Sequence, residues 1–157
     1  MCQRDRETGD RVAPPAMADD LRESYTRAVY RVDAGPAPIR LVVGERNPGL
    51  DRWLAERGAL RFAFLSAANP GSVTLPDDEN RLRHLRLVER LRECGLEAIA
   101  GESYEAATGG WREASLLVCG IEREAAVALA REFRQAALLV GEAGAAVELV
   151  FTAAAAD

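Results

Sequence analysis

The spacing of apolar and polar positions changes every ten to fifteen residues through most of the chain. Alternating positions or short apolar runs predict strands, and apolar residues three or four positions apart predict helices. We predict seven strands, at 24–32, 39–44, 61–67, 97–106, 111–121, 136–141 and 146–151. Three helices are predicted, at 49–57, 78–94 and 122–134.

The predicted order, ββαβαββαββ, is typical of an α/β domain with about three helices packed on one sheet. Turn sequences such as "DAGPAP" and "ATGG" favour hairpins, which place antiparallel strands side by side. The strand–helix–strand units favour parallel neighbours joined by right-handed crossovers. We therefore expect a mixed parallel and antiparallel sheet.

A length of 157 residues with 48% hydrophobic content is typical of a single globular domain. We predict a disordered tail at 1–18, one domain at 19–152 and a short tail at 153–157, with Met17 as a candidate translation start. The N-terminus lacks the apolar core of a secretory signal, and no apolar run approaches the roughly 20 residues of a membrane span. We therefore expect a cytoplasmic protein without a membrane partner.

Charge and cysteine content narrow the classes of function. A net charge of −5 disfavours nucleic acid as a partner, although a helix face with Arg83, Arg86 and Arg90 is predicted to face solvent. Three cysteines without a CxxC pair predict reduced thiols, with Cys94 and Cys119 buried. With one histidine and no clustered ligands, no metal site is expected, and no sequence motif identifies a cofactor.

The stretch "AFLSAANPGS" places polar residues where the strand 61–67 must end. Ligands of α/β sheets favour the carboxyl ends of strands, so Ser66, Asn69 and Ser72 could present hydroxyl and amide groups to a ligand. The alternative is that Asn69 is a turn former before Pro70, which local chemistry alone favours.

Helix 78–94 contributes two further polar residues. Asn80 is a poor residue for a first helical turn, and it could reach back toward the Asn69 loop. His84 falls within the apolar arc that we assign to Leu85, Leu87, Val88, Leu91 and Cys94. A histidine in such an arc is more often a satisfied core group than a catalyst.

Glu113 and Ser115 point to the same side of strand 111–121, which becomes wholly apolar one residue later. A carboxylate entering a sheet interior needs a partner or acquires a raised pKa. A structural pair with an arginine and a functional role are equally open. Gln135 stands at another helix-to-strand junction, beside a strand expected to neighbour this one.

Four separated motifs, "FLSAANPGS", "EN", "GWREASLLVCGI" and "LAREFRQAALLV", resemble the bacterial family known as domain of unknown function 3293. The likeness runs from about residue 21 to 151. It departs from the family pattern at Ser66, where threonine is usual, at Ala68, where an aromatic is expected, and at Arg134, where a small residue is expected. The resemblance implies no reaction or cofactor, but it groups Asn69, Asn80, Glu113 and Gln135 as one hydrogen-bonding network.

Two hypotheses for the function follow. In the first, this small α/β protein binds a small polar ligand or a short peptide at the strand ends. Asn69, Asn80 and Gln135 would orient the ligand, and Glu113 would bind a cationic group or act as an acid or base. In the second, the polar cluster is structural and the protein is a non-catalytic interaction or regulatory module.

Overall fold

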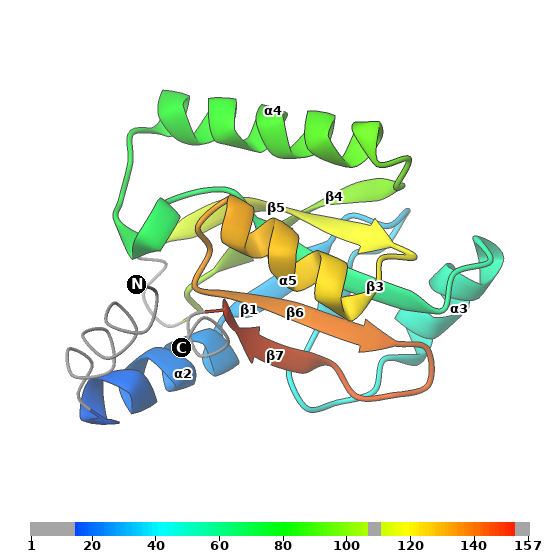
Figure 1. The fold of residues 1–157 in the computed structure, drawn as a ribbon. Coiled ribbons are helices and arrows are strands. Elements are labelled where there is room, and N and C mark those ends of the chain that lie inside the picture. Colours follow the sequence, from blue (N-terminus) through cyan, green and yellow to red (C-terminus); the bar gives the residue numbers. More distant parts are fainter. Residues whose placement is uncertain (1–14, 107–110, 153–157) are drawn as a thin grey trace.

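The computed structural model describes residues 15–106 and 111–152, with side chains from Leu21 onward (Figure 1). The helices are α2 (Pro15–Arg27), α3 (Pro48–Glu56), α4 (Asp77–Glu93) and α5 (Arg123–Glu132), with a 3₁₀ turn η1 (Pro70–Ser72). The strands are β1 (Val29–Val32), β2 (Ile39–Leu41), β3 (Arg61–Ser66), β4 (Ala98–Tyr104), β5 (Arg112–Cys119), β6 (Ala137–Glu142) and β7 (Glu148–Phe151). Some predicted features lie outside the described residues. They are the first fourteen residues of the predicted N-terminal tail, which include Cys2, the hairpin turn 107–110 and the predicted C-terminal tail 153–157.

The seven strands form one sheet in the order β2-β1-β4-β5-β3-β6-β7, and every pair of neighbouring strands is antiparallel. The α/β class is confirmed, but the mixed sheet is wrong. Each helical crossover, through α4 and through α5, joins two strands of the same direction with a third strand between them. β5 lies between β3 and β4, and β3 lies between β5 and β6, so Gln135 precedes a strand that does not neighbour β5.

The sheet is curled, because the segments beside its two edge strands meet. Val43 and Val147 form a single parallel bridge. The Gly44 amide donates to the Val147 carbonyl at 2.8 Å, and the Val147 amide donates to the Glu45 carbonyl at 3.0 Å. The sheet therefore has an inner face, enclosed by the curl, and an outer face.

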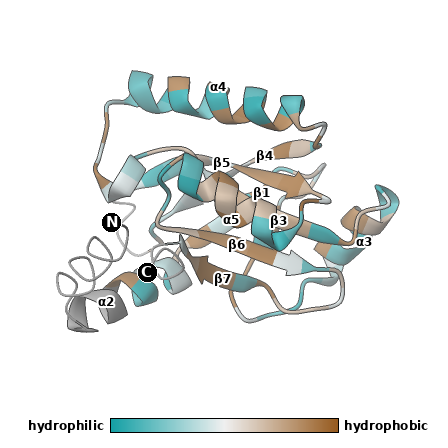
Figure 2. Ribbon diagram, in the orientation of Figure 1, coloured by the Kyte–Doolittle hydropathy of each residue, from teal (hydrophilic) through white to brown (hydrophobic). Residues whose placement is uncertain are grey.

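Each face carries one hydrophobic core. The outer face packs against α4 and α5 through Leu65, Leu87, Leu91, Leu116, Leu129 and Phe133. The inner face packs against α3 through Tyr30, Leu50, Trp53, Leu54, Phe64 and Leu117. Figure 2 shows hydrophobic residues concentrated in the strands and hydrophilic residues along most of α4. Among the described helices, none is long and apolar enough to cross a membrane.

Helix α2 was not predicted, and the described part of the chain contains four α-helices where three were expected. Residues 24–27 belong to α2, so the strand predicted at 24–32 begins only at Val29. The alternation in "SYTRAVYRV" is carried by Tyr25 and Arg27, which fit a helix end equally well. The Tyr30 hydroxyl donates to the Tyr25 carbonyl, which joins the end of α2 to β1. Figure 1 shows α2 and α3 at opposite ends of the sheet.

The apolar arc of α4 is narrower than predicted. Leu87 and Leu91 are buried, but Leu85 is 55% exposed and Cys94 is also exposed, whereas Cys119 is buried as expected. His84 is half-buried, and burial lowers its pKa. Its Nδ1 atom has no hydrogen-bond partner among the described residues, so the prediction of a satisfied core histidine is wrong.

Candidate functional site

The inner face turns from apolar to polar along two neighbouring strands. In β3, Phe64 is followed on the same face by Ser66, and in β5 the inner side chains run from Leu117 through Ser115 to Glu113. Ser66 lies directly opposite Ser115 in the register of the sheet. The polar residues therefore gather at the end of the sheet that lies away from α3.

Two cavities occupy this polar end. The inner cavity has a volume of about 30 Å³, and the outer cavity has a volume of about 200 Å³. Four residues line both of them: Tyr25, Trp111, Glu113 and Gln135. Ser66 and Ser115 line the inner cavity, and Asn69 lines the outer one.

Asn69 is the centre of a hydrogen-bond network that crosses three elements. Its Oδ1 atom accepts from the Leu75 amide at 3.0 Å and from Asn80 Nδ2 at 2.8 Å. Asn80 Oδ1 accepts from the Asn69 amide at 2.9 Å. Because backbone amides can only donate, these bonds fix both side-chain amides in one orientation. Asn69 Nδ2 is thereby directed to Glu113 Oε2, at 3.0 Å.

The β3–α4 loop and the α5–β6 junction are joined by hydrogen bonds to carbonyl groups. Arg83 donates to the carbonyls of Ala67 and Phe133, both at 2.5 Å. Gln135 Nε2 donates to the Ala68 carbonyl at 2.9 Å, and the Gly71 amide donates to the Arg134 carbonyl at 2.8 Å. These bonds hold together two walls of the site.

Arg83 does not share the solvent-facing position predicted for Arg86 and Arg90. It is half-buried, and burial lowers its pKa, as do the charges of Arg86 and Arg134. Arg83 stands four residues before Leu87, so the two side chains lie on the same side of α4. This spacing was the available signal that Arg83 faces the protein.

Backbone strain is concentrated in the same two loops. Within the described residues, the non-glycine positions with positive φ are Asn69 at 50°, Ser72 at 63° and Arg134 at 58°. Such conformations cost on the order of 1 kcal/mol or more for most residues, asparagine being among the better tolerated. Strained positions of this kind cluster at functional sites.

Arg134→Gly is expected to raise the stability of the protein slightly. A left-handed conformation costs an L-residue about 1–2 kcal/mol, and glycine avoids this cost. Glycine also loses more backbone entropy on folding, which lowers stability by about 0.5–1 kcal/mol. We expect a net gain of up to about 1 kcal/mol, measured by urea unfolding. Arg131→Gly in the exposed last turn of α5 is the matched control and should lose about 1 kcal/mol, as glycine does inside helices. A loss in Arg134→Gly of the same size would contradict the strained conformation.

Glu113 carries the main electrostatic feature of the site. Burial raises the pKa of its carboxyl group, and the hydrogen bond from Asn69 lowers that pKa by less. The predicted arginine partner is not found: Glu113 forms no ion pair with any residue in 21–106 or 111–152. Burial also raises the pKa of Tyr25, which a hydrogen bond to Ser72 partly offsets and the Glu113 charge reinforces.

The serine hydroxyls are directed toward the protein interior and one another. Ser66 Oγ accepts from the Ala68 amide at 2.9 Å, and the hydroxyls of Ser103 and Ser115 are 3.0 Å apart. The inner cavity that they line with Glu113 exceeds the roughly 10–15 Å³ that one water molecule needs. These serines therefore line the interior side of the site, next to the Glu113 carboxyl group.

The structure thus brings the sequence candidates together. Ser66, Asn69, Glu113, Ser115 and Gln135 line one cavity or the other, and Asn80 holds Asn69 in place. His84 lines neither cavity.

Sequence reasoning missed Tyr25, because its helix was not recognised, and Trp111, although Trp111 stands two residues before Glu113 on the same strand face. Ala68, where an aromatic was expected, is buried. The aromatic lining comes instead from Tyr25 and Trp111.

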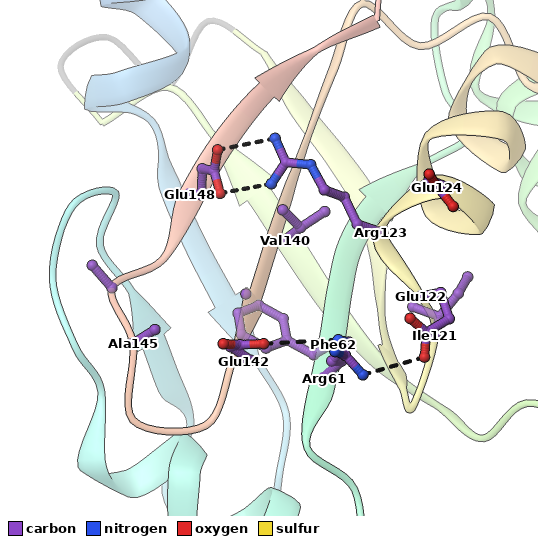
Figure 3. Close-up of a pocket in the computed structure, with 12 residues that line it drawn as sticks. Arg61, Phe62, Ile121, Glu122, Arg123, Glu124, Val140, Glu142, Ala145 and Glu148 are labelled. Carbon is purple, nitrogen blue, oxygen red and sulfur yellow. Dashed lines mark hydrogen bonds and ion pairs between the residues drawn. The ribbon is translucent and has the colours of Figure 1, made fainter.

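A larger cavity, of about 490 Å³, lies at the beginning of β3, away from the candidate residues (Figure 3). Its arginines are paired: Arg123 holds Glu148 through bonds of 2.7 and 3.0 Å, and Arg61 reaches Glu122 at 3.3 Å. The side chains of these pairs are 45–69% exposed. Exposed, paired charges of this kind are ordinary surface chemistry, so we place the candidate site around Glu113.

The comparisons with known proteins agree with the motif resemblance. The model of the family described as "Protein of unknown function (DUF3293)" matches residues 65–138, a segment that contains all six candidate residues. The match does not extend over the whole range 21–151 expected from the motifs, and Tyr25 lies outside it. No curated protein and no solved structure matches the chain. Residues 65–138 of the chain are therefore similar to the DUF3293 family.

Proposed function

We propose that this protein binds a small ligand in the outer cavity, against Glu113. One observation carries the proposal: a carboxyl group whose pKa burial has raised lines a cavity of about 200 Å³ and has no ion-pair partner in the described residues. Titratable groups with perturbed pKa values in a concave site are typical of functional residues. The strained Asn69 and Ser72, both in the cavity wall, support the same conclusion.

The alternative, an interaction module with a structural polar cluster, has less support. Its sign would be a contiguous exposed apolar patch. Within the described residues, the large hydrophobic side chains that are exposed come from several separate segments of the sequence: Leu21, Val42, Leu60, Val73, Leu82 and Leu85.

A screen of small metabolites by thermal shift tests the proposal, with a variant that fills the cavity. Ser24→Phe places a ring in the wall of the outer cavity, whereas Thr26→Phe places the same ring on the same helix outside the cavity lining. Ligands are expected to raise the Tm of the parent and of Thr26→Phe but not of Ser24→Phe. Compounds that protect Ser24→Phe equally well would bind elsewhere and would refute the proposed site, as would a screen that yields no ligand.

Glu113→Gln is expected to raise Tm at neutral pH, because glutamine keeps an acceptor for Asn69 and removes the buried charge. The pKa of Glu113 is raised in the folded protein, so ionisation costs the folded state more than the unfolded state. The parent therefore loses stability relative to the variant as pH rises from the ordinary carboxyl pKa through the raised one. We expect a gain of about 0.5–2 kcal/mol at pH 7, the range usual for a single stabilising substitution, and a smaller gain at pH 4.5.

Paired thermal melts at the two pH values measure this difference. Glu97→Gln, an exposed carboxylate that pairs with Arg57 at 3.2 Å, is the control and should change stability by about 0.5 kcal/mol or less. A fall in the Tm of Glu113→Gln at pH 7 would support the structural alternative for the cluster.

A further inference from the structure

Gln135 and Glu113 supply the outer cavity with free hydrogen-bond acceptors. Gln135 uses its Nε2 atom on two carbonyls, those of Ala68 at 2.9 Å and Phe133 at 3.2 Å. Carbonyls only accept, so the orientation of this amide is fixed. Its Oε1 atom accepts no hydrogen bond from the described residues, and the side chain lines both cavities.

Glu113 adds further acceptor capacity. An ionised carboxylate has about four acceptor sites. Within the described chain, its hydrogen bond comes from Asn69 Nδ2 at 3.0 Å. Asn69 Oδ1 is already occupied by two donors, so Asn69 offers the cavity a remaining N–H and no free oxygen.

The charge of the lining has one sign. Among the described residues that line the outer cavity there is no arginine or histidine, and the titratable groups are Tyr25 and Glu113. The pKa of Tyr25 is raised, so the phenol stays neutral at physiological pH. An ionised Glu113 therefore leaves the cavity with one uncompensated negative charge in a partly desolvated position.

The walls and volume limit what can enter. Tyr25, Trp111 and Leu21 supply aromatic and aliphatic surface beside the polar groups. A volume of about 200 Å³ limits the site to a small ligand. One carboxylate among these groups is a poor match for Mg²⁺ or Ca²⁺, which are held by several oxygen ligands.

We propose that the ligand is a small organic cation with N–H donors, a primary ammonium or a guanidinium group on a short apolar body. Its donors would pair with the Glu113 carboxylate and Gln135 Oε1, and its body would lie against Tyr25 and Trp111. This inference rests on the proposed function and specifies the ligand class. A cation would also offset the cost of ionising Glu113, so its affinity should rise with pH.

The test compares matched probes on the full chain by NMR, using the indole N–H signal of Trp111. The sequence contains two tryptophans, so Trp53→Phe assigns the signals. The probes are butylammonium and butylguanidinium, their neutral counterparts butanol and butylurea, and butyltrimethylammonium, a cation without N–H groups. We expect at least one of the first two to bind at least tenfold more tightly than its neutral counterpart and than butyltrimethylammonium at pH 8. We expect its affinity to fall by at least tenfold in Glu113→Gln and to decrease toward pH 5 in the parent.

Each other outcome overturns a defined statement. Equal binding of neutral probes, or undiminished binding to Glu113→Gln, refutes the cation and leaves the ligand-binding function standing. Equal binding of butyltrimethylammonium refutes the requirement for N–H donors. If neither donor cation binds while screened compounds protect the parent and not Ser24→Phe, this inference fails alone. If nothing protects the parent through the outer cavity, the proposed function fails as well.

Discussion

Asn69→Ala is expected to lower the unfolding free energy by about 2–4 kcal/mol. Its side chain receives hydrogen bonds from the Leu75 amide and Asn80 and donates one to Glu113. Each bond contributes about 0.5–1.5 kcal/mol, and a donor left buried and unpaired costs more. Alanine must also adopt the φ of 50°, which asparagine tolerates better. At about 2–4 °C per kcal/mol, Tm should fall by roughly 4–16 °C.

Two other substitutions separate the causes of that loss. Asn69→Gly loses the same three bonds but relaxes the backbone, so it should be less destabilising than alanine. Asn47→Ala removes an asparagine that caps α3 through Leu50 at 2.9 Å and donates to Arg40, with an unstrained φ of −133°. It should cost about 1 kcal/mol, the usual value of such a cap. If Asn69→Ala cost no more than Asn47→Ala, the network around Asn69 would not hold the loop as described.

The same network connects stability with the site. Asn69 is the hydrogen-bond donor to Glu113, and its bond lowers the pKa of that carboxyl group. Losing the bond should raise the pKa of Glu113 further, so Asn69→Ala should also weaken cation binding at neutral pH. Asn80→Ala should weaken it by less, because Asn80 reaches Glu113 only through Asn69.

The local elements were largely predictable from the sequence. Strand and helix periodicity placed β3 to β7 and helices α3 to α5 within a few residues, because those segments bury one clear face. "SYTR" was misassigned because its alternation fits the end of α2 as well as a strand. Because the end of α2 was misassigned, Tyr25 was not recognised as a residue of the cavity wall.

The arrangement of the strands was not predictable in the same way. A strand–helix–strand unit indicates that two strands run in one direction, but it does not say whether a third strand enters between them. Here β5 and β3 each fill such a position, and the pairing partners come from distant parts of the chain. Glu113 and Asn69, 44 positions apart in sequence, meet because β5 neighbours β3. The motif resemblance predicted that Asn69 and Glu113 belong to one network, and the pairing of β5 with β3 explains why they meet.

Gly101→Ala is expected to destabilise the protein by about 2–3 kcal/mol, which corresponds to a Tm lower by roughly 4–12 °C. Gly101 lies in β4 between Val32 of β1 and Ser115 of β5. A Cβ atom there would lie 2.5 Å from the Arg31 carbonyl oxygen and 2.8 Å from Cε1 of Phe64. The first contact is with backbone, so relief requires β1 and β4 to separate. The slight advantage of alanine over glycine in a strand is too small to offset this.

Gly49→Ala is the matched control for the same chemical change. Its Cβ would lie 3.4 Å from Asn47 Oδ1 inside α3, where alanine is the better helix former, so stability should rise by up to about 1 kcal/mol. Phe64→Leu combined with Gly101→Ala should recover only part of the loss, because the Arg31 carbonyl stays in place. Full recovery would mean that the Phe64 ring alone requires glycine at this position. Phe64 also lines the inner cavity with Glu113. In Gly101→Ala the displaced Phe64 ring should therefore also change how the effect of Glu113→Gln on stability depends on pH.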